Sequence, residues 1–503
     1  MKNFIPSVMA TQHPDNANAP FWEQDGDGFV SAKEEVLEAY TAYEQLAVDE
    51  YMWDWEGKHV DEAVVERLLT EHYAYFKKHQ LGKDKRLTFR IPNIWQEKGY
   101  SLARAFMSIL TAADMADDLK SYGRPLFEVI LPMTTSAKQL LHIQTTFTKL
   151  AKVKHQLFAD HQPDFNYIHI IPLIESIEEM FAVSKLLNDY VTQHQRFYKQ
   201  KPAYIRPFLA RSDPALMSGM IAAVIGNKVA LSELRQWQEQ QHINVYPIVG
   251  TGSLPFRGSC APDRIQEFIE EYRGVKTVTV QSAFRYDYPL TQVKQAIKKL
   301  QQKLPNTVAL QFSEQDTIKL QQIARKAAKY YYTTIQALAP QILKVCAHIP
   351  ARRERRLHIG LLGYSRAIGK QKFPRAITFT AAMYSLGVPP ELVGTGKLLR
   401  SLNKAEGELL HKAYHNLEHD LIQAGHYLNK HTLKLLAKKS PAWKTIQDDV
   451  LFIEQYFGIK LEPHTVNQQL HHNATSDLYY LLKRQGNYSS TILKAGRLRN
   501  SLG

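Results

Sequence analysis

The pattern of hydrophobic and polar positions divides the chain into two parts. Over the first two-thirds, short apolar runs rich in β-branched residues alternate with longer segments whose apolar residues recur every three or four positions. The short runs are typical of strands, and the longer segments, such as 101–119 and 136–158, are typical of amphipathic helices. Their alternation predicts βα units and a parallel sheet. From about residue 315 the pattern is helical, as in 313–345 and 405–428.

Eight segments of the first part are candidate strands, and several are nearly all apolar, as expected for strands covered on both faces. They span 86–91, 126–132, 167–175, 203–210, 243–250, 277–283 and 307–312, with a weaker candidate at 49–57 that could instead be the end of a helix. Eight strands are the number of a (β/α)8 barrel. A doubly wound open sheet fits if 49–57 is not a strand.

The predicted fold is therefore of the α/β class, a (β/α)8 TIM-type barrel with a large helical C-terminal extension. We expect residues 1–315 to form an N-terminal arm and the barrel, and residues 316–503 to form helices packed on it. We find no internal repeat and no low-complexity linker between the two parts.

The composition indicates a globular protein of the cytoplasm. Hydrophobic residues make up 44% of the chain and charged residues 22%, and no run of about eighteen apolar residues predicts a membrane helix. The first residues contain no apolar segment of a secretory signal. Two cysteines, Cys260 and Cys346, argue against a disulfide framework and for a reducing compartment. We therefore expect no membrane partner.

The charge is strongly positive, with 63 lysines and arginines against 49 acids and a net charge of +14. Such an excess favours anionic partners, which include nucleic acids and small anions. The densest cluster, Arg352, Arg353, Arg355 and Arg356, could equally be the solvated face of a helix. No nucleic-acid-binding module accompanies it, so we expect no nucleic-acid partner. A basic nucleic-acid-binding protein is the distant alternative.

Candidate functional residues lie at the predicted C-terminal ends of the strands, where barrel enzymes carry their sites. These ends or the loops after them contain Arg90, Glu175, Arg211, Asp213, Arg257, Gln281 and Arg285. Glu175 and Asp213 come from neighbouring strands and could share Mg²⁺, which takes one or two protein carboxylates. Alternatively, Glu175 is an acid at a helix start, and Asp213 an N-cap before Pro214.

Two glycine-bounded segments add arginines to this set. The loop "GTGSLPFRGS" contains Arg257, and "GLLGYSRAIGKQKFPRAI" contains Arg366 and Arg375. A guanidinium can bind two oxygens of a phosphate or carboxylate at once, although both segments could also be ordinary surface turns. A carboxylate pair among arginines predicts a site for a small phosphorylated acid, at which an enolate could be stabilised.

The segment "MATQHPDN", residues 9–16, resembles the N-terminal signature of the archaeal-type, short-form phosphoenolpyruvate carboxylases. Further similar segments follow along nearly the whole chain: "DEYMWDWEGK", "IPLIES", "SLPFRGS", "VQSAFRYDY", "GYSRA" and the final "LRNSLG". The resemblance implies a barrel with added helices, assembled as a homotetramer (a dimer of dimers). It also implies the irreversible conversion of phosphoenolpyruvate and bicarbonate into oxaloacetate and phosphate with Mg²⁺ or Mn²⁺, through carboxyphosphate and the enolate of pyruvate.

The resemblance also implies roles for individual residues. Glu175 and Asp213 match the metal ligands, and His13 matches the histidine that accepts the proton of carboxyphosphate. The N-terminal arm is then expected to fold across the barrel mouth. Arg257 and Arg366 match catalytic arginines, and Arg90, Arg211, Gln281 and Arg285 are expected to bind substrate.

Departures from the longer carboxylases limit what the resemblance implies. Phe256 stands where their glycine-rich loop has a histidine, and their lysine after the metal aspartate is absent here. Allosteric control by acetyl-coenzyme A or aspartate is therefore not implied. The alternative activity is that of another Mg²⁺-dependent barrel enzyme acting on phosphoenolpyruvate or pyruvate, which would not need His13.

Overall fold

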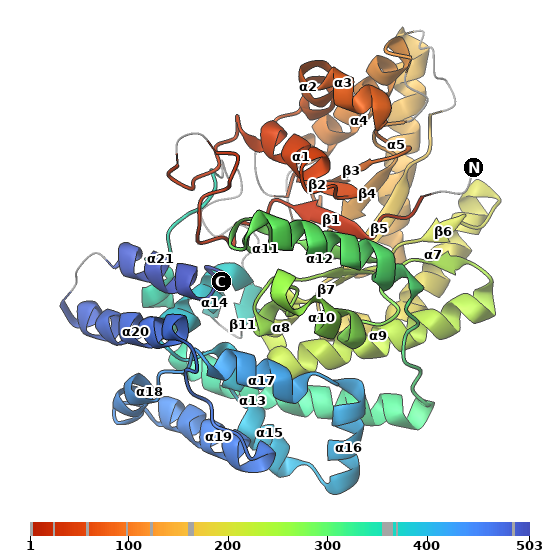
Figure 1. Cartoon of the computed structure of the whole chain (residues 1–503). Helices are drawn as coiled ribbons and strands as arrows, with labels where there is room; N and C mark the ends of the chain where they lie inside the picture. Colours follow the sequence, from red (N-terminus) through yellow and green to blue (C-terminus); the bar gives the residue numbers. More distant parts are fainter. Residues whose placement is uncertain are drawn as a thin grey trace.

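The computed structural model describes residues 4–23, 26–56, 60–96, 99–120, 124–158, 165–354, 366–368, 371–484 and 488–503. Within these residues eight parallel strands close into a barrel in the order β1-β10-β9-β7-β5-β4-β3-β2 (Figure 1). They are β1 (Val8–Thr11), β2 (Glu50–Asp54), β3 (Arg86–Arg90), β4 (Glu128–Leu131), β5 (His169–Ile174), β7 (Phe208–Ala210), β9 (Ile248–Gly250) and β10 (Thr277–Val280). The short strands β6 (Tyr204–Ile205) and β8 (Asn244–Val245) pair separately. The predicted barrel is confirmed.

One predicted strand is wrong and one was missed. The weak candidate at 49–57 is β2, but residues 307–312 form no strand. Backbone groups of this segment bind the helix α9 (Met220–Gln241) instead of joining a sheet: the Phe312 N–H donates to Ser232 Oγ at 3.0 Å, and Arg235 Nη1 donates to the Ala309 main-chain oxygen at 2.8 Å. The eighth strand is Val8–Thr11, which pairs with both β10 and β2. Part of the expected N-terminal arm is therefore a barrel strand.

Helices surround the strands. They are α1 (Glu35–Glu44), α2 (Val64–Glu71), α3 (Tyr73–Lys78), α4 (Tyr100–Asp118), α5 (Ala137–Phe158), α6 (Ile177–Phe181), α7 (Val183–Tyr198), α8 (Ser212–Ser218), α9 (Met220–Gln241), α10 (Ile265–Glu271), α11 (Ser282–Tyr286) and α12 (Leu290–Lys303). The predicted helices at 101–119 and 136–158 correspond to α4 and α5. Their apolar sides pack against the outer face of the sheet, as amphipathic helices do.

The end of the barrel opposite the strands' C-termini is closed by a buried ionic network. The first residues of β2, β3 and β4 are Glu50, Arg86 and Glu128, and Arg206 lies between them. Arg206 contacts Glu50 at 2.6 Å and Glu128 at 2.7 Å, and Arg86 also pairs with Glu128. All are buried. Charges this deep in the protein need paired partners, so this end is filled by structural contacts.

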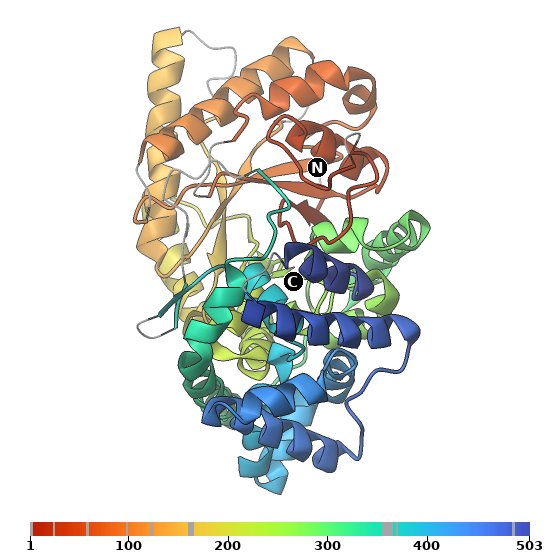
Figure 2. The same cartoon turned by 90° about the vertical axis from the view of Figure 1, so that its left-hand side faces the viewer.

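The C-terminal helices pack on one side of the barrel (Figures 1 and 2). They are α13 (Glu314–Cys346), α14 (Ala376–Ser385), α15 (Thr395–Ser401), α16 (Lys404–Ala413), α17 (Leu417–Gly425), α18 (Lys430–Ala437), α19 (Pro441–Phe457), α20 (Val466–Arg484) and α21 (Ser489–Leu498), with the hairpin β11 (Arg366–Ile368) and β12 (Gln371–Phe373) before α14. One hydrophobic core contains residues of α8 and α9 together with residues of α13 and α14. The helical extension is confirmed, and a division at residue 315 stays a prediction.

Two further expectations concern the chain as a whole. Among the described residues, no helix is long and apolar enough to cross a membrane. Cys260 and Cys346 are both free, in agreement with the expected lack of a disulfide framework.

Candidate active site

The C-terminal ends of the barrel strands surround one cavity. Seven residues that were expected from the sequence line it together, and they lie at or after the ends of six of the barrel strands. They are His13, Arg90, Glu175, Arg211, Asp213, Arg257 and Gln281. Arg375, which lies just before α14, completes the charged part of the wall, and Leu173 and Phe208 belong to its apolar part. The β-barrel thus gathers side chains that are far apart in the sequence.

The two carboxylates reach the cavity from neighbouring strands. Glu175 directly follows β5, and Asp213 lies in the first turn of α8 after β7, the parallel partner of β5. Arg211, not Asp213, occupies the N-cap position of α8. Among the described residues, no group of three or more histidine, cysteine or acidic side chains is arranged to hold a metal ion. Two carboxylates suit a divalent cation that takes its other ligands from water and substrate.

Arg90 is held at the cavity by two acids. Its Nε donates to Asp54 Oδ1 at 2.8 Å and its Nη2 to Asp54 Oδ2 at 2.6 Å, while Nη2 also lies 2.8 Å from Glu56 Oε2. Glu56 additionally contacts Arg375 at 3.1 Å. Burial alone would lower the pKa of Arg90, but Asp54 and Glu56 outweigh burial and raise it. Two arginines are therefore fixed side by side through one shared carboxylate.

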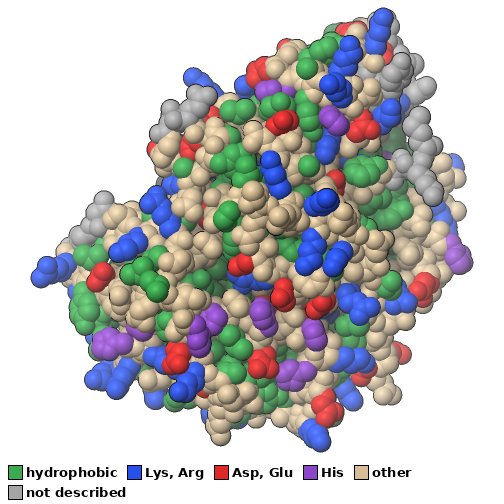
Figure 3. Space-filling model, viewed as in Figure 1, with side chains coloured by type: hydrophobic (Ala, Val, Ile, Leu, Met, Phe, Trp, Pro, Cys, Tyr) green, Lys and Arg blue, Asp and Glu red, His purple; other side chains and the backbone are tan. Residues whose placement is uncertain are grey.

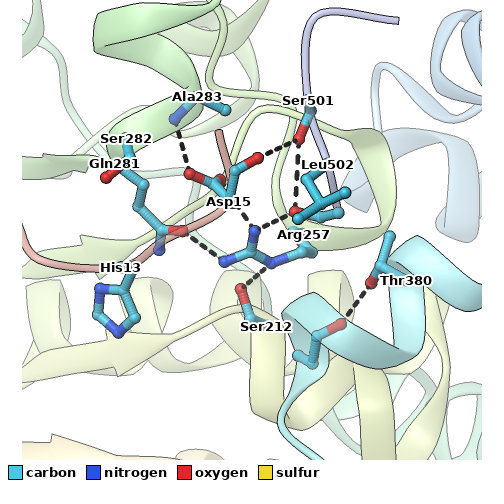
Figure 4. Close-up of polar contacts among 12 residues, drawn as sticks. His13, Asp15, Ser212, Arg257, Gln281, Ser282, Ala283, Thr380, Ser501 and Leu502 are labelled. Carbon is cyan, nitrogen blue, oxygen red and sulfur yellow. Dashed lines mark hydrogen bonds and ion pairs between the residues drawn. The ribbon is translucent and has the colours of Figure 1, made fainter. Parts of the chain in front are cut away.

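Arg257 is almost fully enclosed at the cavity, with 1% of its side chain exposed. Its Nη1 donates to Asp15 Oδ2 at 2.9 Å and to the Gly503 main-chain oxygen at 2.5 Å. Its Nη2 donates to Gln281 Oε1 and its Nε to Ser212 Oγ at 3.2 Å. Figure 4 shows this set of contacts around the guanidinium. Burial lowers the pKa of Arg257, and Asp15 counteracts that effect only in part.

His13 lies two residues beyond β1, and it lines the cavity beside Gln281 (Figure 4). Its Nδ1 is 2.9 Å from Thr11 Oγ1, and its main-chain oxygen accepts hydrogen bonds from the N–H groups of Asp15 and Ser282. Burial and the neighbouring Arg90 lower the pKa of His13 well below its ordinary value, against an opposite effect of Asp54. The imidazole is therefore neutral at pH 7 and able to accept a proton.

Arg211 lines the cavity, but its donors support the neighbouring loop. Its Nη1 donates to the Phe256 main-chain oxygen at 3.0 Å and its Nε to the Tyr272 hydroxyl at 3.0 Å. The Phe256 ring lies in the core between the barrel and the C-terminal helices. Arg211 thus braces the glycine-rich loop after β9 that contains Arg257.

The structure does not bring Arg285 to the cavity. Arg285 is fully buried, donates to Glu38 Oε1 at 3.0 Å and to the Thr11 main-chain oxygen at 2.7 Å, and stacks on Tyr286. The guanidinium of Arg285 holds the end of β1 in this structure, and the expected contact of Arg285 with substrate stays a prediction. The Arg366 side chain lies outside the described residues, although its backbone belongs to β11.

The described part of the basic cluster after α13, Arg352 and Arg353, is not a solvated helix face. Arg352 and Arg353 are only 5% and 4% exposed, and Arg353 pairs with Glu35 at 2.9 Å and with Glu38. Arg355 and Arg356 lie outside the described residues. On the face shown in Figure 3, lysine and arginine side chains are dispersed over the barrel and the C-terminal helices instead of gathering in one patch.

A parallel barrel with a carboxylate pair, several arginines and a neutral histidine at its strand ends defines an enzyme site for small, highly charged anions. A family model described as "Phosphoenolpyruvate carboxylase" matches residues 5–503. Curated proteins named phosphoenolpyruvate carboxylase are similar over most of their length. Those of Leuconostoc mesenteroides, Oenococcus oeni and Methanothermobacter thermautotrophicus share 44%, 43% and 38% identity, covering 93%, 99% and 99% of this chain and 92%, 99% and 100% of their own.

The chain therefore belongs to the phosphoenolpyruvate carboxylase family. Membership implies a divalent metal cofactor, which agrees with the chemistry of Glu175 and Asp213.

Proposed function

We propose that the protein carboxylates phosphoenolpyruvate with bicarbonate and releases oxaloacetate and inorganic phosphate. The observation that carries the proposal is the cavity that places His13 among arginines and across from two carboxylates at the strand ends of the barrel. Family membership supports the same reaction.

In the proposed site, Glu175 and Asp213 hold a divalent cation, Mg²⁺ or Mn²⁺. When bound, the cation supplies positive charge next to oxygen atoms of the substrate and of the enolate. Arg90 and Arg375, which Glu56 keeps in place, bind the phosphate and carboxylate groups of phosphoenolpyruvate. Arg366 keeps its proposed role as a catalytic arginine, and Arg285 is left out of the site.

The reaction proceeds in two stages. An oxygen of bicarbonate attacks phosphorus, the bond between phosphorus and the enol oxygen breaks, and carboxyphosphate and the enolate of pyruvate result. Arg257 faces the charge that develops at this stage. His13 then takes the carboxyl proton of carboxyphosphate, which splits into CO₂ and phosphate, and the enolate carbon attacks CO₂ to form oxaloacetate. His13 then passes the proton to the released phosphate.

Thr11 contacts one nitrogen of His13, and in the proposed mechanism the other nitrogen acts. The Nδ1 atom faces the Thr11 hydroxyl at 2.9 Å, and Nε2 is the nitrogen proposed to accept the proton. For Nε2 to be unprotonated in the neutral ring, the ring proton must sit on Nδ1 and be donated to Thr11 Oγ1. A base that is neutral at working pH typically contributes about 10²–10⁴-fold to the rate.

The proposal includes the assembly and the location of the enzyme, a homotetramer in the cytoplasm. Large apolar side chains that are exposed in the single chain, such as Leu157 (71%), Phe158 (68%) and Val466 (76%), support subunit contacts. Light scattering on the purified protein tests the assembly, and a mass of one chain would contradict it.

A coupled assay tests the reaction. The protein is mixed with phosphoenolpyruvate, bicarbonate and Mg²⁺, and oxaloacetate is followed by its reduction with malate dehydrogenase and NADH. We expect a rate that requires bicarbonate and the cation. Consumption of phosphoenolpyruvate without oxaloacetate would instead favour another barrel enzyme acting on this substrate.

A further inference from the structure

Asp15 is a buried carboxylate that lies two residues after His13 and is not part of the cavity wall. It is 0% exposed, and both of its oxygens are used. Oδ2 accepts from Arg257 Nη1 at 2.9 Å, and Oδ1 accepts from the Ala283 N–H at 2.7 Å. The Asp15 main-chain oxygen accepts from the Leu502 N–H at 2.7 Å. Asp15 therefore joins four segments that are distant in sequence (Figure 4).

The contact with Asp15 fixes the orientation of Arg257. A guanidinium has five N–H groups in one plane. Within the described residues, Asp15, Gly503, Gln281 and Ser212 accept from four of them. A single N–H, on Nη2, remains for a ligand. Asp15 is the side-chain carboxylate in this set, and its charge-assisted hydrogen bond restrains the plane of the guanidinium strongly.

The same residue restrains His13 through the main chain. The Asp15 N–H donates to the His13 oxygen at 3.1 Å, and the Ser282 N–H donates to that oxygen at 3.2 Å. Together with the bond from Ala283 to Asp15 Oδ1, these contacts attach both ends of the turn 13–15 to the start of α11. A displacement of the Asp15 side chain would therefore move both His13 and Arg257.

We propose that Asp15 is a positioning residue that keeps His13 and Arg257 in one arrangement, so that carboxyphosphate formed beside Arg257 breaks down at His13 before it can be lost. The inference rests on the proposed carboxylation. A misaligned site would still transfer the phosphoryl group, but part of the enolate would take a proton from water and leave as pyruvate, while the carboxyphosphate would break down to CO₂ and phosphate.

The test is the product ratio of Asp15→Asn. Asparagine has nearly the same shape and can still accept from the Ala283 N–H, but it removes the charge opposite Arg257. Oxaloacetate is trapped by excess malate dehydrogenase. Pyruvate is measured with lactate dehydrogenase, and released phosphate is measured in a separate assay. We expect kcat to fall roughly 10-fold to 100-fold, because small displacements at a reacting centre have effects of that size, and pyruvate to rise as a share of the product.

Asp287→Asn is the matched control. Asp287 is also a buried carboxylate that anchors the same N-terminal segment, through the N–H groups of Ala17 and Asn18 at 2.7 Å each. Among the contacts of Arg257 with the described residues, none involves Asp287, so the loss of the Asp287 carboxylate tests anchoring alone. We expect Asp287→Asn to leave the ratio of pyruvate to oxaloacetate as in the wild type.

Three results separate the possibilities. Wild-type protein that makes no oxaloacetate would refute the proposed function itself. Wild-type carboxylation with an unchanged product ratio in Asp15→Asn, or with equal shifts in Asp15→Asn and Asp287→Asn, would overturn the positioning role. If Asp15→Asn does not fold, Asp15→Glu carries the test, since it keeps the charge but displaces it by one methylene. The positioning role then predicts more pyruvate, and an unchanged ratio refutes it.

Discussion

Replacing Thr11 by valine tests whether the catalytic histidine depends on one particular tautomer. Thr11 is 0% exposed, and its hydroxyl lies 2.9 Å from His13 Nδ1. Valine preserves the branched shape, so the strand β1 should form as before. The change leaves the Nδ1–H of the active tautomer without its acceptor.

The size of the effect follows from that lost contact. A hydrogen bond contributes a net ~1 kcal/mol, and a buried donor without a partner costs about 1–3 kcal/mol. Since each 1.4 kcal/mol corresponds to a factor of ten, we expect oxaloacetate formation to fall about 5-fold to 100-fold. Thr11→Ser keeps the hydroxyl and should restore most of the rate.

Steady-state oxaloacetate formation is measured for both variants, with thermal unfolding as the control for folding. Phosphoenolpyruvate consumption is recorded in the same samples. A Thr11→Val protein that folds and works as fast as the wild type would refute the argument that Thr11 orients the base.

Three other predictions concern the metal ligands, the base and the pH dependence of stability. Glu175→Gln and Asp213→Asn should each reduce metal-dependent turnover at least roughly 100-fold, since a bound metal contributes several kcal/mol, and wild-type rates would remove either residue from the metal site. His13→Asn should still consume phosphoenolpyruvate but yield mainly pyruvate, and complete loss of both activities would mean that His13 acts earlier. Burial raises the pKa of Asp287 to about 7. The folded state therefore binds this proton more tightly, and its contribution to stability, on the order of 4 kcal/mol, is present below about pH 4 and lost as the pH rises to 7. Urea unfolding at several pH values should show a smaller decline in Asp287→Asn than in the wild type, and equal declines would contradict the assignment.

The sequence predicted the barrel well because most of its strands have a clear local signal. The runs around Val129, Ile171 and Val278 are apolar over several positions, and the helices between them have a clear period. The strand Val8–Thr11 has only four residues and is recognisable only through its partners β10 and β2. Residues 307–312 show a similar local pattern, but their backbone groups bind side chains of α9 instead of a neighbouring strand.

The residues of the site could be predicted where a strand end placed them, as for Glu175 and Gln281. The arginines were harder, because the partner of an arginine depends on the packing of distant segments. Arg285 was expected at the substrate and pairs with Glu38, which lies 247 residues away in the sequence. Arg257 meets Asp15 across 242 residues. Charge alone does not indicate which of these arginines bind ligands and which balance buried acids.

The most direct test of the proposed mechanism is to follow the atoms of bicarbonate. The protein is supplied with phosphoenolpyruvate, a divalent cation and bicarbonate labelled with ¹³C and ¹⁸O, and the product is trapped as malate. The proposed mechanism predicts ¹³C in the new carboxyl group and one ¹⁸O atom of bicarbonate in the released phosphate. Phosphate without ¹⁸O would contradict attack of bicarbonate on phosphorus, and malate without ¹³C would contradict the carboxylation itself.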